Sequence, residues 1–480
     1  MKTDFKSLTP MSLVFAIFFT ICFYQNQSGI AVFLFAVFMN LISIWLFRKY
    51  EIQTKKADYL YMAGILLLGF LSVITADFKI LFLNHIMMIL FVIAFYLHRC
   101  FAYEGWDIPE YLTKFLSIMF GGITKIASPI SDLLKVIRVE SETKKTRNAV
   151  QAVLIGIVIA VPILFIITGL LSQADAVFGY AVNRLIRNIT IPEKLIEITI
   201  MLLFGFFLFY CGVTNLFSTF EKHPKKTNRM GEPLIAITFT SLVGLVYFFF
   251  SVIQVIYLFA GLNRLPEGYT YSAYAREGFF QLVAVCLFNV MLVVFCFYYY
   301  REHHVLKISL TVISSCTYIM TGSSAYRMIL YIQEYGLTFL RVFVLWVLAL
   351  IFLTLTGIVL AIFYERFSLM RYYLICFFGW YLLFGYSHPD CYIAAYNLNH
   401  DQIEGNLDVY YLNEMSADAA GSILHKRKEL NSKSDLSGEE RRFLSTTESY
   451  ATQIREEAEN MDFRSFNLSI YWADIILSME

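Results

Sequence analysis

The chain has 480 residues, of which 58% are hydrophobic and 16% charged, against roughly 45–50% and about 25% in an ordinary soluble domain. The mean hydropathy of +0.61, with 46 Phe and 32 Tyr, is more apolar side-chain surface than a soluble fold of this size can bury. A water-soluble enzyme is therefore excluded. The composition predicts an all-α polytopic integral membrane protein.

Eleven continuous apolar runs are long enough, or nearly long enough, to cross a bilayer, which takes about 20 residues as a helix. Their lack of apolar-polar alternation favours helices over a β-barrel. The predicted spans are 10–24, 29–47, 59–76, 80–97, 149–172, 196–218, 233–260, 277–300, 306–329, 338–363 and 372–387. The first and last are short, so the count of eleven is uncertain by one.

Lys and Arg in the loops predict the orientation, because cytoplasmic loops are enriched in both. With the N-terminus inside, the inner segments hold 22 basic residues and the outer ones 8. We therefore expect a cell (inner, cytoplasmic) membrane protein with its N-terminus inside and its C-terminus outside. In the inner stretch 98–148, apolar residues from Tyr111 to Phe120 repeat at helical spacing and predict an interfacial helix that turns at Gly121-Gly122.

Charge divides the chain into two predicted parts. Residues 1–387 form a transmembrane helical domain with 30 Lys and Arg against 20 Asp and Glu, and residues 388–480 form an acidic tail with 8 against 17. The tail predicts short helices at about 406–430, 437–460 and 464–478, the second opened by a capping box of Ser437 and Glu440. We expect the last to dock on the outer face of the membrane domain.

Charged residues beside the spans are costly and mark candidate sites. On this topology they gather on the outer side. The set comprises Asp175, Arg276, Glu277, Arg327, Glu334, Arg341, His388 and Asp390. They predict an outward-facing vestibule in which Arg side chains meet an anionic group. The alternative for any single residue is snorkelling to the interface.

One predicted span, 306–329, has a polar face. Ser314, Thr317, Thr321 and Ser324 follow each other at spacings of three and four. Small hydroxyl residues favour close helix packing, and the other interpretation is a polar track for a proton or a head group.

No motif indicates a cofactor, and neither the cysteines nor the histidines have a spacing that indicates a metal site. Most of the eight cysteines lie in apolar runs, which predicts buried free thiols. The expected partners are membrane lipids, an anionic lipid or small-molecule ligand and a protein at the C-terminal tail, with no nucleic acid.

Several outer segments resemble a bacterial membrane family known as domain of unknown function 4173. The similar positions are 174–178, 274–282, Arg327, Met328, Tyr331, 335–338, Leu340, Arg341, 388–390, Tyr396, Asn397, Asp408, Tyr411, Leu412 and 416–419. The family's Asp-Trp-Arg-Ser-Trp-Asn reads Asp-Phe-Arg-Ser-Phe-Asn at 462–467, without the indole donors. The resemblance covers about 170–475; it implies an inner-membrane protein with a C-terminal tail and no assigned activity.

Three functions remain open. The first is transport or handling of an anionic lipid or small molecule, with Arg276, Arg327 and Arg341 as anion contacts and Glu277 and Asp175 as their partners. The second is a non-catalytic sensor or regulator whose outer tail binds a partner. The third is an intramembrane transferase on a lipid-linked substrate, with Asp175, Glu277 or His388 as base.

Overall fold

The structure is a computed structural model that describes residues 5–53, 55–101, 108–141, 156, 160, 164, 167–186, 192–220, 229–256, 279–364, 366–399 and 409–479. The described elements are helices, apart from an isolated bridge between Gly231 and Tyr300. The chain divides into two compact units, one formed by 1–25 and 115–223 and the other by 26–114 and 224–480. The predicted boundary at 387/388 stays a prediction.

Nine described helices are long and apolar enough to cross a membrane, which makes this a multi-span membrane protein. They are α1 (Phe5–Phe23), α2 (Ile30–Lys49), α3 (Lys56–Ile74), α4 (Phe78–Cys100), α9 (Glu193–Phe220), α10 (Pro233–Gln254), α12 (Phe279–Tyr299), α13 (His304–Tyr335) and α14 (Phe339–Phe363).

The two other predicted spans are not among these nine helices, so the count of eleven stays a prediction. Span 149–172 lies mostly outside the described residues. Span 372–387 corresponds to α15 (Leu369–Tyr386), an 18-residue helix in which Arg371 and several Tyr and Trp side chains lower the mean hydropathy.

The unit of 1–25 and 115–223 is built on the pairing of α1 with α9. Phe15 stacks on Phe209 with ring centroids 4.8 Å apart, and Gly205 lets α9 approach the backbone of Ala16. Its other described helices are the end of α5 (Ile108–Gly121), η1 (Gly122–Lys125), α6 (Ser128–Ser141) and α8 (Ala176–Ile186). The helix predicted from Tyr111 onward thus ends at Gly121, as expected; its interfacial placement stays a prediction.

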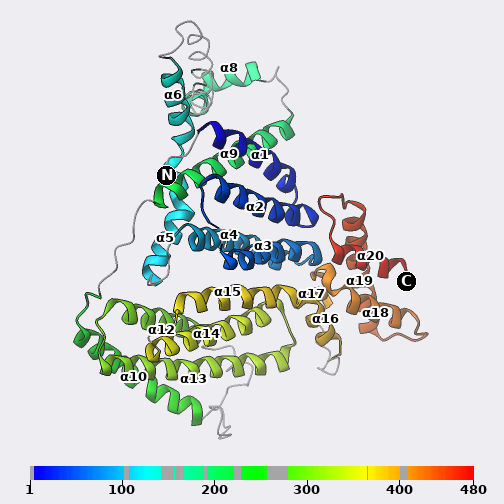
Figure 1. Cartoon of the computed structure of the whole chain (residues 1–480). Helices are drawn as coiled ribbons and strands as arrows, with labels where there is room; N and C mark the ends of the chain where they lie inside the picture. Colours follow the sequence, from blue (N-terminus) through cyan, green and yellow to red (C-terminus); the bar gives the residue numbers. More distant parts are fainter. Residues whose placement is uncertain are drawn as a thin grey trace. The chain divides into compact units, whose positions relative to one another are not determined.

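The larger unit contains two groups of membrane helices joined through α15. In the first group, α2, α3 and α4 pack in sequence, and Gly69 lies so close to α2 that a Cβ there would be 2.5 Å from that of Ala36. In the second, α13 packs against α10, α12 and α14. Figure 1 shows α15 between the groups; it bonds to α14 through reciprocal indole-to-carbonyl contacts of Trp346 and Trp380 (3.1 and 3.0 Å) and to α4 through Tyr381 and the carbonyl of Ile80 (3.2 Å).

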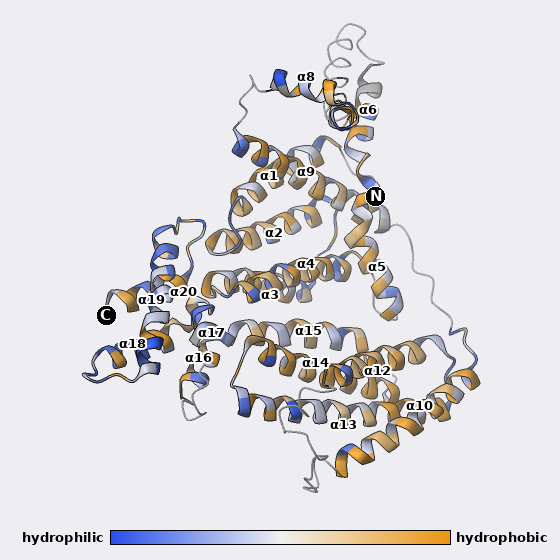
Figure 2. Cartoon of the chain, turned by 180° about the vertical axis from the view of Figure 1, so that it is seen from behind, coloured by the Kyte–Doolittle hydropathy of each residue, from blue (hydrophilic) through white to orange (hydrophobic). Residues whose placement is uncertain are grey.

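The C-terminal helices gather at one end of these membrane helices (Figure 1). They are α16 (Pro389–Asn399), α17 (Val409–Asn413), η3 (Ala417–Ala419), α18 (Ala420–Asn431), α19 (Gly438–Glu459) and α20 (Leu468–Ser478). Figure 2 shows them as more hydrophilic than the spans. They still share an apolar core, which includes Ile393, Leu424, Tyr450 and Leu477.

Two tail predictions can be compared with these helices. The capping box is confirmed: Ser437 Oγ accepts from the N–H of Glu440, whose carboxylate accepts from the N–H of Ser437. The single helix predicted at about 406–430 is wrong within the described part, because the chain breaks after α17. At that break the backbone N–H and Oγ of Ser416 donate to Asp390, an interaction that a continuous helix would not allow.

Candidate functional site

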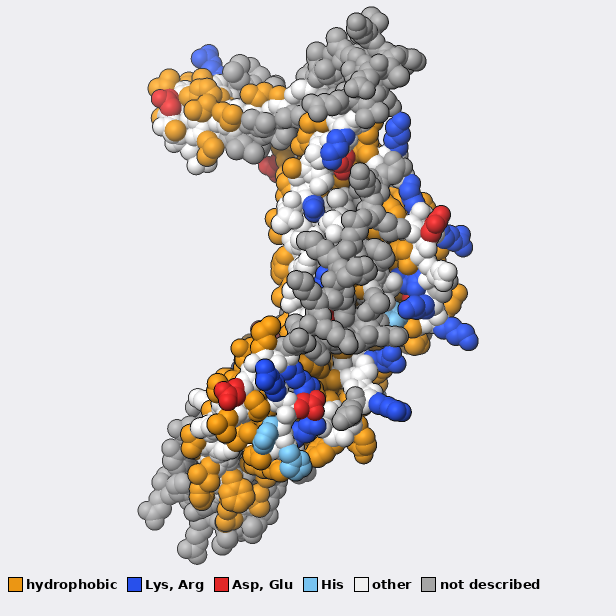
Figure 3. Space-filling view, turned by 60° about the vertical axis from the view of Figure 1, so that its left-hand side comes forward, with side chains coloured by type: hydrophobic (Ala, Val, Ile, Leu, Met, Phe, Trp, Pro, Cys, Tyr) orange, Lys and Arg blue, Asp and Glu red, His pale blue; other side chains and the backbone are white. Residues whose placement is uncertain are grey.

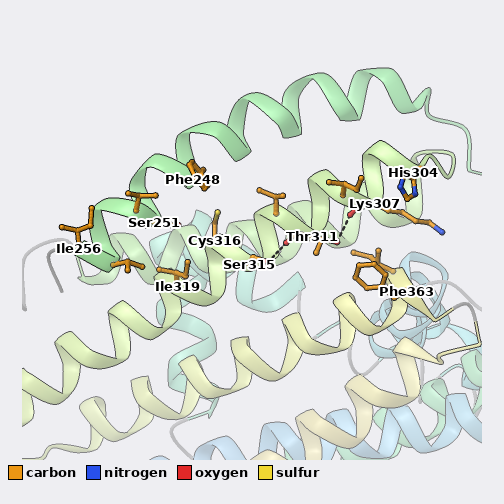
Figure 4. Close-up of a pocket in the computed structure, with 15 residues that line it drawn as sticks. Phe248, Ser251, Ile256, His304, Lys307, Thr311, Ser315, Cys316, Ile319 and Phe363 are labelled. Carbon is orange, nitrogen blue, oxygen red and sulfur yellow. Dashed lines mark hydrogen bonds between the residues drawn. The ribbon is translucent and has the colours of Figure 1, made fainter. Parts of the chain in front are cut away.

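The strongest candidate for a ligand site is a groove of about 690 Å³ formed by α10, α13 and α14. Figure 4 shows its course along α13, with His304 and Lys307 at one end and Ile256 and Ile319 at the other. Phe248 and Phe363 contribute aromatic walls from α10 and α14. The groove therefore follows the long axis of a membrane helix.

The groove wall is apolar although it contains hydroxyl residues. Thr311 Oγ1 donates to the carbonyl of Lys307 (2.8 Å), and Ser315 Oγ donates to the carbonyl of Thr311 (2.9 Å), as the dashed lines in Figure 4 mark. A hydroxyl that bonds its own helix presents little polarity to a neighbour. The wall consequently suits a hydrocarbon chain better than a polar solute.

Charge is concentrated at the end of the groove where α13 begins. Lys307 Nζ lies 3.2 Å from a carboxylate oxygen of Glu302, whose other oxygen lies 2.6 Å from the guanidinium of Arg229. The hydrogen bond from Lys307, together with Arg229, lowers the pKa of Glu302. Arg301 and Glu232 also lie at this end, where Arg301 donates its N–H to the carbonyl of Gly231, and Figure 3 shows basic, acidic and His side chains beside an apolar surface.

A second polar site lies where the C-terminal helices meet the membrane helices, and Asp418 of η3 is at its centre. The carboxylate accepts from Thr75 Oγ1 (2.6 Å), the N–H of Ala76 (2.9 Å) and Ser469 Oγ, and His388 Nδ1 lies 3.1 Å away. The side chain of Asp418 is 1% exposed. It therefore bonds together the α3–α4 turn, the α15–α16 corner and α20.

Two further buried carboxylates, Asp77 and Asp390, belong to the same junction. Asp390 Oδ2 accepts from the N–H (3.1 Å) and Oγ (2.8 Å) of Ser416, and its Oδ1 lies 3.9 Å from Lys79 Nζ. Asp77 Oδ1 accepts from the N–H of Lys79 (2.8 Å). Within the described part of the chain, Oδ1 of Asp390 and Oδ2 of Asp77 accept no hydrogen bond. Lys79 is thus the cation that the two carboxylates share.

The electrostatics of this junction shift several pKa values. Burial, followed by the charge of Asp390, raises the pKa of Asp77 to about 6. The hydrogen bond to Asp418 raises the pKa of His388, and the donors around Asp418 outweigh its burial and lower its pKa. His388 also has a left-handed backbone, with φ +49°, a conformation uncommon for a residue other than glycine.

Of the predicted site residues, the structure brings His388 and Asp390 together at this junction. Arg327 is buried on α13, where its Nη2 donates to Gln254 Oε1 on α10 (3.3 Å). Arg341 donates to the carbonyls of Tyr335 (2.8 Å) and Gly336 at the end of α13 and lies over the ring of Tyr331. Both arginines therefore have partners within the chain.

The remaining predicted charges lie apart from these contacts or outside the described residues. Glu334 is exposed near the end of α13. Asp175 belongs to the other unit, is exposed and accepts from the N–H of Phe178 at the start of α8 (2.7 Å). Arg276 and Glu277 lie outside the described residues.

The polar face of α13 is turned toward neighbouring helices. Ser314, Thr317 and Thr321 donate to carbonyls four residues earlier. Thr317 Oγ1 also accepts from Asn289 Nδ2 on α12 (3.0 Å), and Ser324 is fully buried. This arrangement favours helix packing over an open polar track.

The site residues predicted from the sequence did not include Asp77, Lys79 or Lys307. A signal for Asp77 was present, since the turn between the third and fourth predicted spans lies on the same predicted side as His388. For Lys307 the signal was weaker, because a lysine at the inner end of a span is the ordinary positive-inside pattern. Its position at the end of a groove depends on how α10 packs on α13.

Within the described part of the chain, no group of three or more His, Cys, Asp or Glu is arranged to hold a metal ion. The eight cysteines are thiols; six are buried, Cys376 is partly buried and Cys391 is exposed. Comparison with known proteins returned no matching curated protein and no matching solved structure. The family model for a domain of unknown function, DUF4153, matches residues 62–425. The resemblance to domain of unknown function 4173 was therefore wrong, and the chain belongs to the family described as domain of unknown function DUF4153.

Proposed function

We propose that this protein binds an anionic membrane lipid in the groove of α10, α13 and α14, as part of the handling or transport of that lipid. The observation that carries the proposal is the position of Lys307 at the end of a groove whose walls are otherwise apolar. A lipid needs this combination, because its phosphate must meet cations while its acyl chain remains in hydrocarbon.

The length of the groove supports a lipid of one leaflet. Lys307 and Ile319 line its two ends, and 12 helical residues extend about 18 Å. The hydrocarbon core of a bilayer is about 30 Å thick, so that each leaflet contributes about half of it. An acyl chain that starts at Lys307 would therefore remain in the groove to about the middle of the membrane.

The distribution of basic residues supports the orientation that we propose with this function. At the ends of the membrane helices remote from the C-terminal helices lie Arg48, Lys49, Lys55, Lys56, Arg99, Arg229, Arg301, Lys307, Arg366 and Arg371. The turns beside the C-terminal helices carry Lys79 and Arg341. By the positive-inside rule the groove would open toward the cytoplasmic leaflet of the cell membrane, with the C-terminal helices outside.

The groove is better supported as an anion site than the vestibule of Arg276, Arg327 and Arg341. Arg327 is buried and Arg341 donates to backbone carbonyls, whereas Lys307, although it pairs with Glu302, is partly exposed and lines an open groove. The anion-contact role of the three arginines stays a prediction. The alternative functions, a sensor or regulator and an intramembrane transferase, also stay predictions.

The test is native mass spectrometry of the purified protein titrated with phosphatidylglycerol and, separately, with phosphatidylcholine. One Lys near a membrane surface contributes about 1 kcal/mol to anionic-lipid binding, so Lys307→Gln should weaken phosphatidylglycerol binding about five-fold. Ser315→Phe, which places a ring in the groove, should weaken the binding of both lipids. Lys49→Gln is the matched control, because Lys49 lies on the same basic side but outside the groove.

Equal affinity of the wild type for the two lipids would contradict the proposal. The same conclusion would follow if Lys49→Gln and Lys307→Gln weakened phosphatidylglycerol binding equally, since this would indicate general surface attraction.

A further inference from the structure

The junction between the C-terminal helices and the membrane helices contains more buried negative charge than its cations neutralise. Asp418 is matched by His388 when the imidazole is protonated. Among the described residues, the cation paired with Asp77 and Asp390 is Lys79, whose Nζ lies 4.0 and 3.9 Å from them. One negative charge of this pair therefore has no matching cation there, and an uncompensated buried charge is strongly unfavourable.

The carboxylate oxygens of Asp77 and Asp390 indicate that a bound proton removes this charge. Oδ2 of Asp77 and Oδ1 of Asp390 accept no hydrogen bond from the described residues, and the two residues are 1% and 0% exposed. An ionised carboxylate can only accept, whereas a protonated one gains a donor. A proton on Asp77 therefore removes the uncompensated charge and adds a donor at the buried site.

We propose that Asp77 binds a proton at this contact, beside the carboxylate of Asp390, and that this proton strengthens the attachment of the C-terminal helices to the membrane helices. Asp390 begins α16 and bonds the start of η3 through Ser416, while Asp77 caps the N-terminus of α4. The proton thus sits at the contact between the two parts, and its source is the solvent that reaches the half-exposed Lys79.

Other titratable groups act on this pair from each neighbouring element: Lys79 on α4, Tyr381 on α15, Tyr411 on α17, Asp418 on η3 and Tyr450 on α19. His388 and Cys391 at the α15–α16 corner act on Asp418, and Arg341 on α14 acts on Tyr411. Lys79 opposes proton binding by Asp77, and Asp418 favours it. His388 changes charge at a higher pH than the pair, because its hydrogen bond to Asp418 raises its pKa.

The sign of the pH effect follows from linkage. The pKa of Asp77 is about 6 in the docked state and returns toward 3.8 when the C-terminal helices detach, so docking takes up a proton. Docking should therefore weaken as the pH rises from about 4 to about 6, by roughly 100-fold in all. The loss of the His388 charge should weaken it further above pH 6.5, a separate and later step.

The direct test is infrared difference spectroscopy of the full-length protein in lipid nanodiscs between pH 4.5 and 7.5. The wild type should show the carbonyl band of one buried protonated carboxyl, lost with a midpoint near pH 6. The band should be absent in Asp77→Asn, and Asp390→Asn should lower its midpoint, because the charge of Asp390 helps to raise the pKa of Asp77. The control is Asp435→Asn, which changes an exposed tail carboxyl and should leave the band unchanged.

Lys79→Gln is the second variant, for the case that an Asn variant fails to fold. Removing this cation should raise the midpoint, because its charge opposes the proton. A missing band in the wild type, a band retained in Asp77→Asn, or a midpoint that both Asp390→Asn and Lys79→Gln leave unchanged would overturn the proposal. A midpoint that falls when sodium chloride replaces choline chloride would overturn it in favour of a metal cation.

Discussion

Replacing Asp418 with alanine removes one acceptor from three separate parts of the larger unit. The lost partners are the hydroxyl of Thr75 and the N–H of Ala76 in the α3–α4 turn, the hydroxyl of Ser469 on α20 and the imidazole of His388. The carboxylate is 1% exposed, so water does not replace it without local opening. The expected result is that the C-terminal helices detach far more often.

The magnitude follows from the groups left behind. A buried donor without an acceptor costs about 1–3 kcal/mol, and removing one partner of a buried ion pair costs about 3–5 kcal/mol. The hydroxyls of Thr75 and Ser469 can rotate to other acceptors, whereas the N–H of Ala76 cannot. We therefore expect a loss of about 3–5 kcal/mol, or a factor of roughly 100 to several thousand in the docking equilibrium.

Hydrogen–deuterium exchange of peptides from α18 and α20, measured on full-length protein at pH 6, reports this equilibrium. Asp418→Ala should raise their exchange rates by about the same factor while α13 peptides remain protected. Asp418→Asn, which keeps one carbonyl acceptor but loses the charge, should give an intermediate result. Asp435→Ala is the control for removal of an exposed acid. Unchanged protection of α20 in Asp418→Ala would refute the view that this carboxylate holds the junction together.

Two further substitutions test other parts of the larger unit. Gly29→Ala should loosen the segment before α20 by about 2 kcal/mol or more, since Gly29 has φ +80° and a Cβ there would lie 2.5 Å from the carbonyl carbon of Ser465; exchange of α20 peptides measures this, and native-like protection would contradict it. Arg99→Met should cost about 3–5 kcal/mol because it leaves Asp58 buried without its ion-pair partner at 3.2 Å. Adding Asp58→Leu should recover most of the stability lost in Arg99→Met. Thermal unfolding in detergent measures this, and an equal or larger loss in the double variant would contradict it.

The membrane helices could be predicted because their signal is local. Most of the predicted spans correspond to described helices, since a run of about 20 apolar residues has few stable conformations in a bilayer other than a helix. The capping box at Ser437 is local in the same sense, because both of its hydrogen bonds join residues three apart. Such features need no knowledge of which helices are neighbours.

The sites could be predicted only in part, because their partners are distant in sequence. Arg327 was visible as a costly charge, but its contact with Gln254 depends on the packing of α13 against α10. Asp77 and Asp418 are 341 positions apart in the chain, and they enter one network through Thr75, whose hydroxyl donates to Asp418 and accepts from the N–H of Asp77. Hydropathy and charge patterns do not indicate which residues that are distant in sequence will be in contact.

The segment 462–467 shows why the C-terminal helices are part of the fold of the membrane domain. The carbonyls of Arg464 and Phe466 accept from the N–H groups of Ala31 and Ile30, which begin α2 and have no acceptor within that helix. Asn467 continues the contact, since its Nδ2 donates to the carbonyl of Thr75 (2.7 Å) while its Oδ1 caps α20. These bonds come from the backbone and from one amide, so they do not depend on the aromatic side chains of Phe463 and Phe466. Deleting the C-terminal helices would expose the start of α2 and the α3–α4 turn, and its effects would include those of a damaged membrane domain.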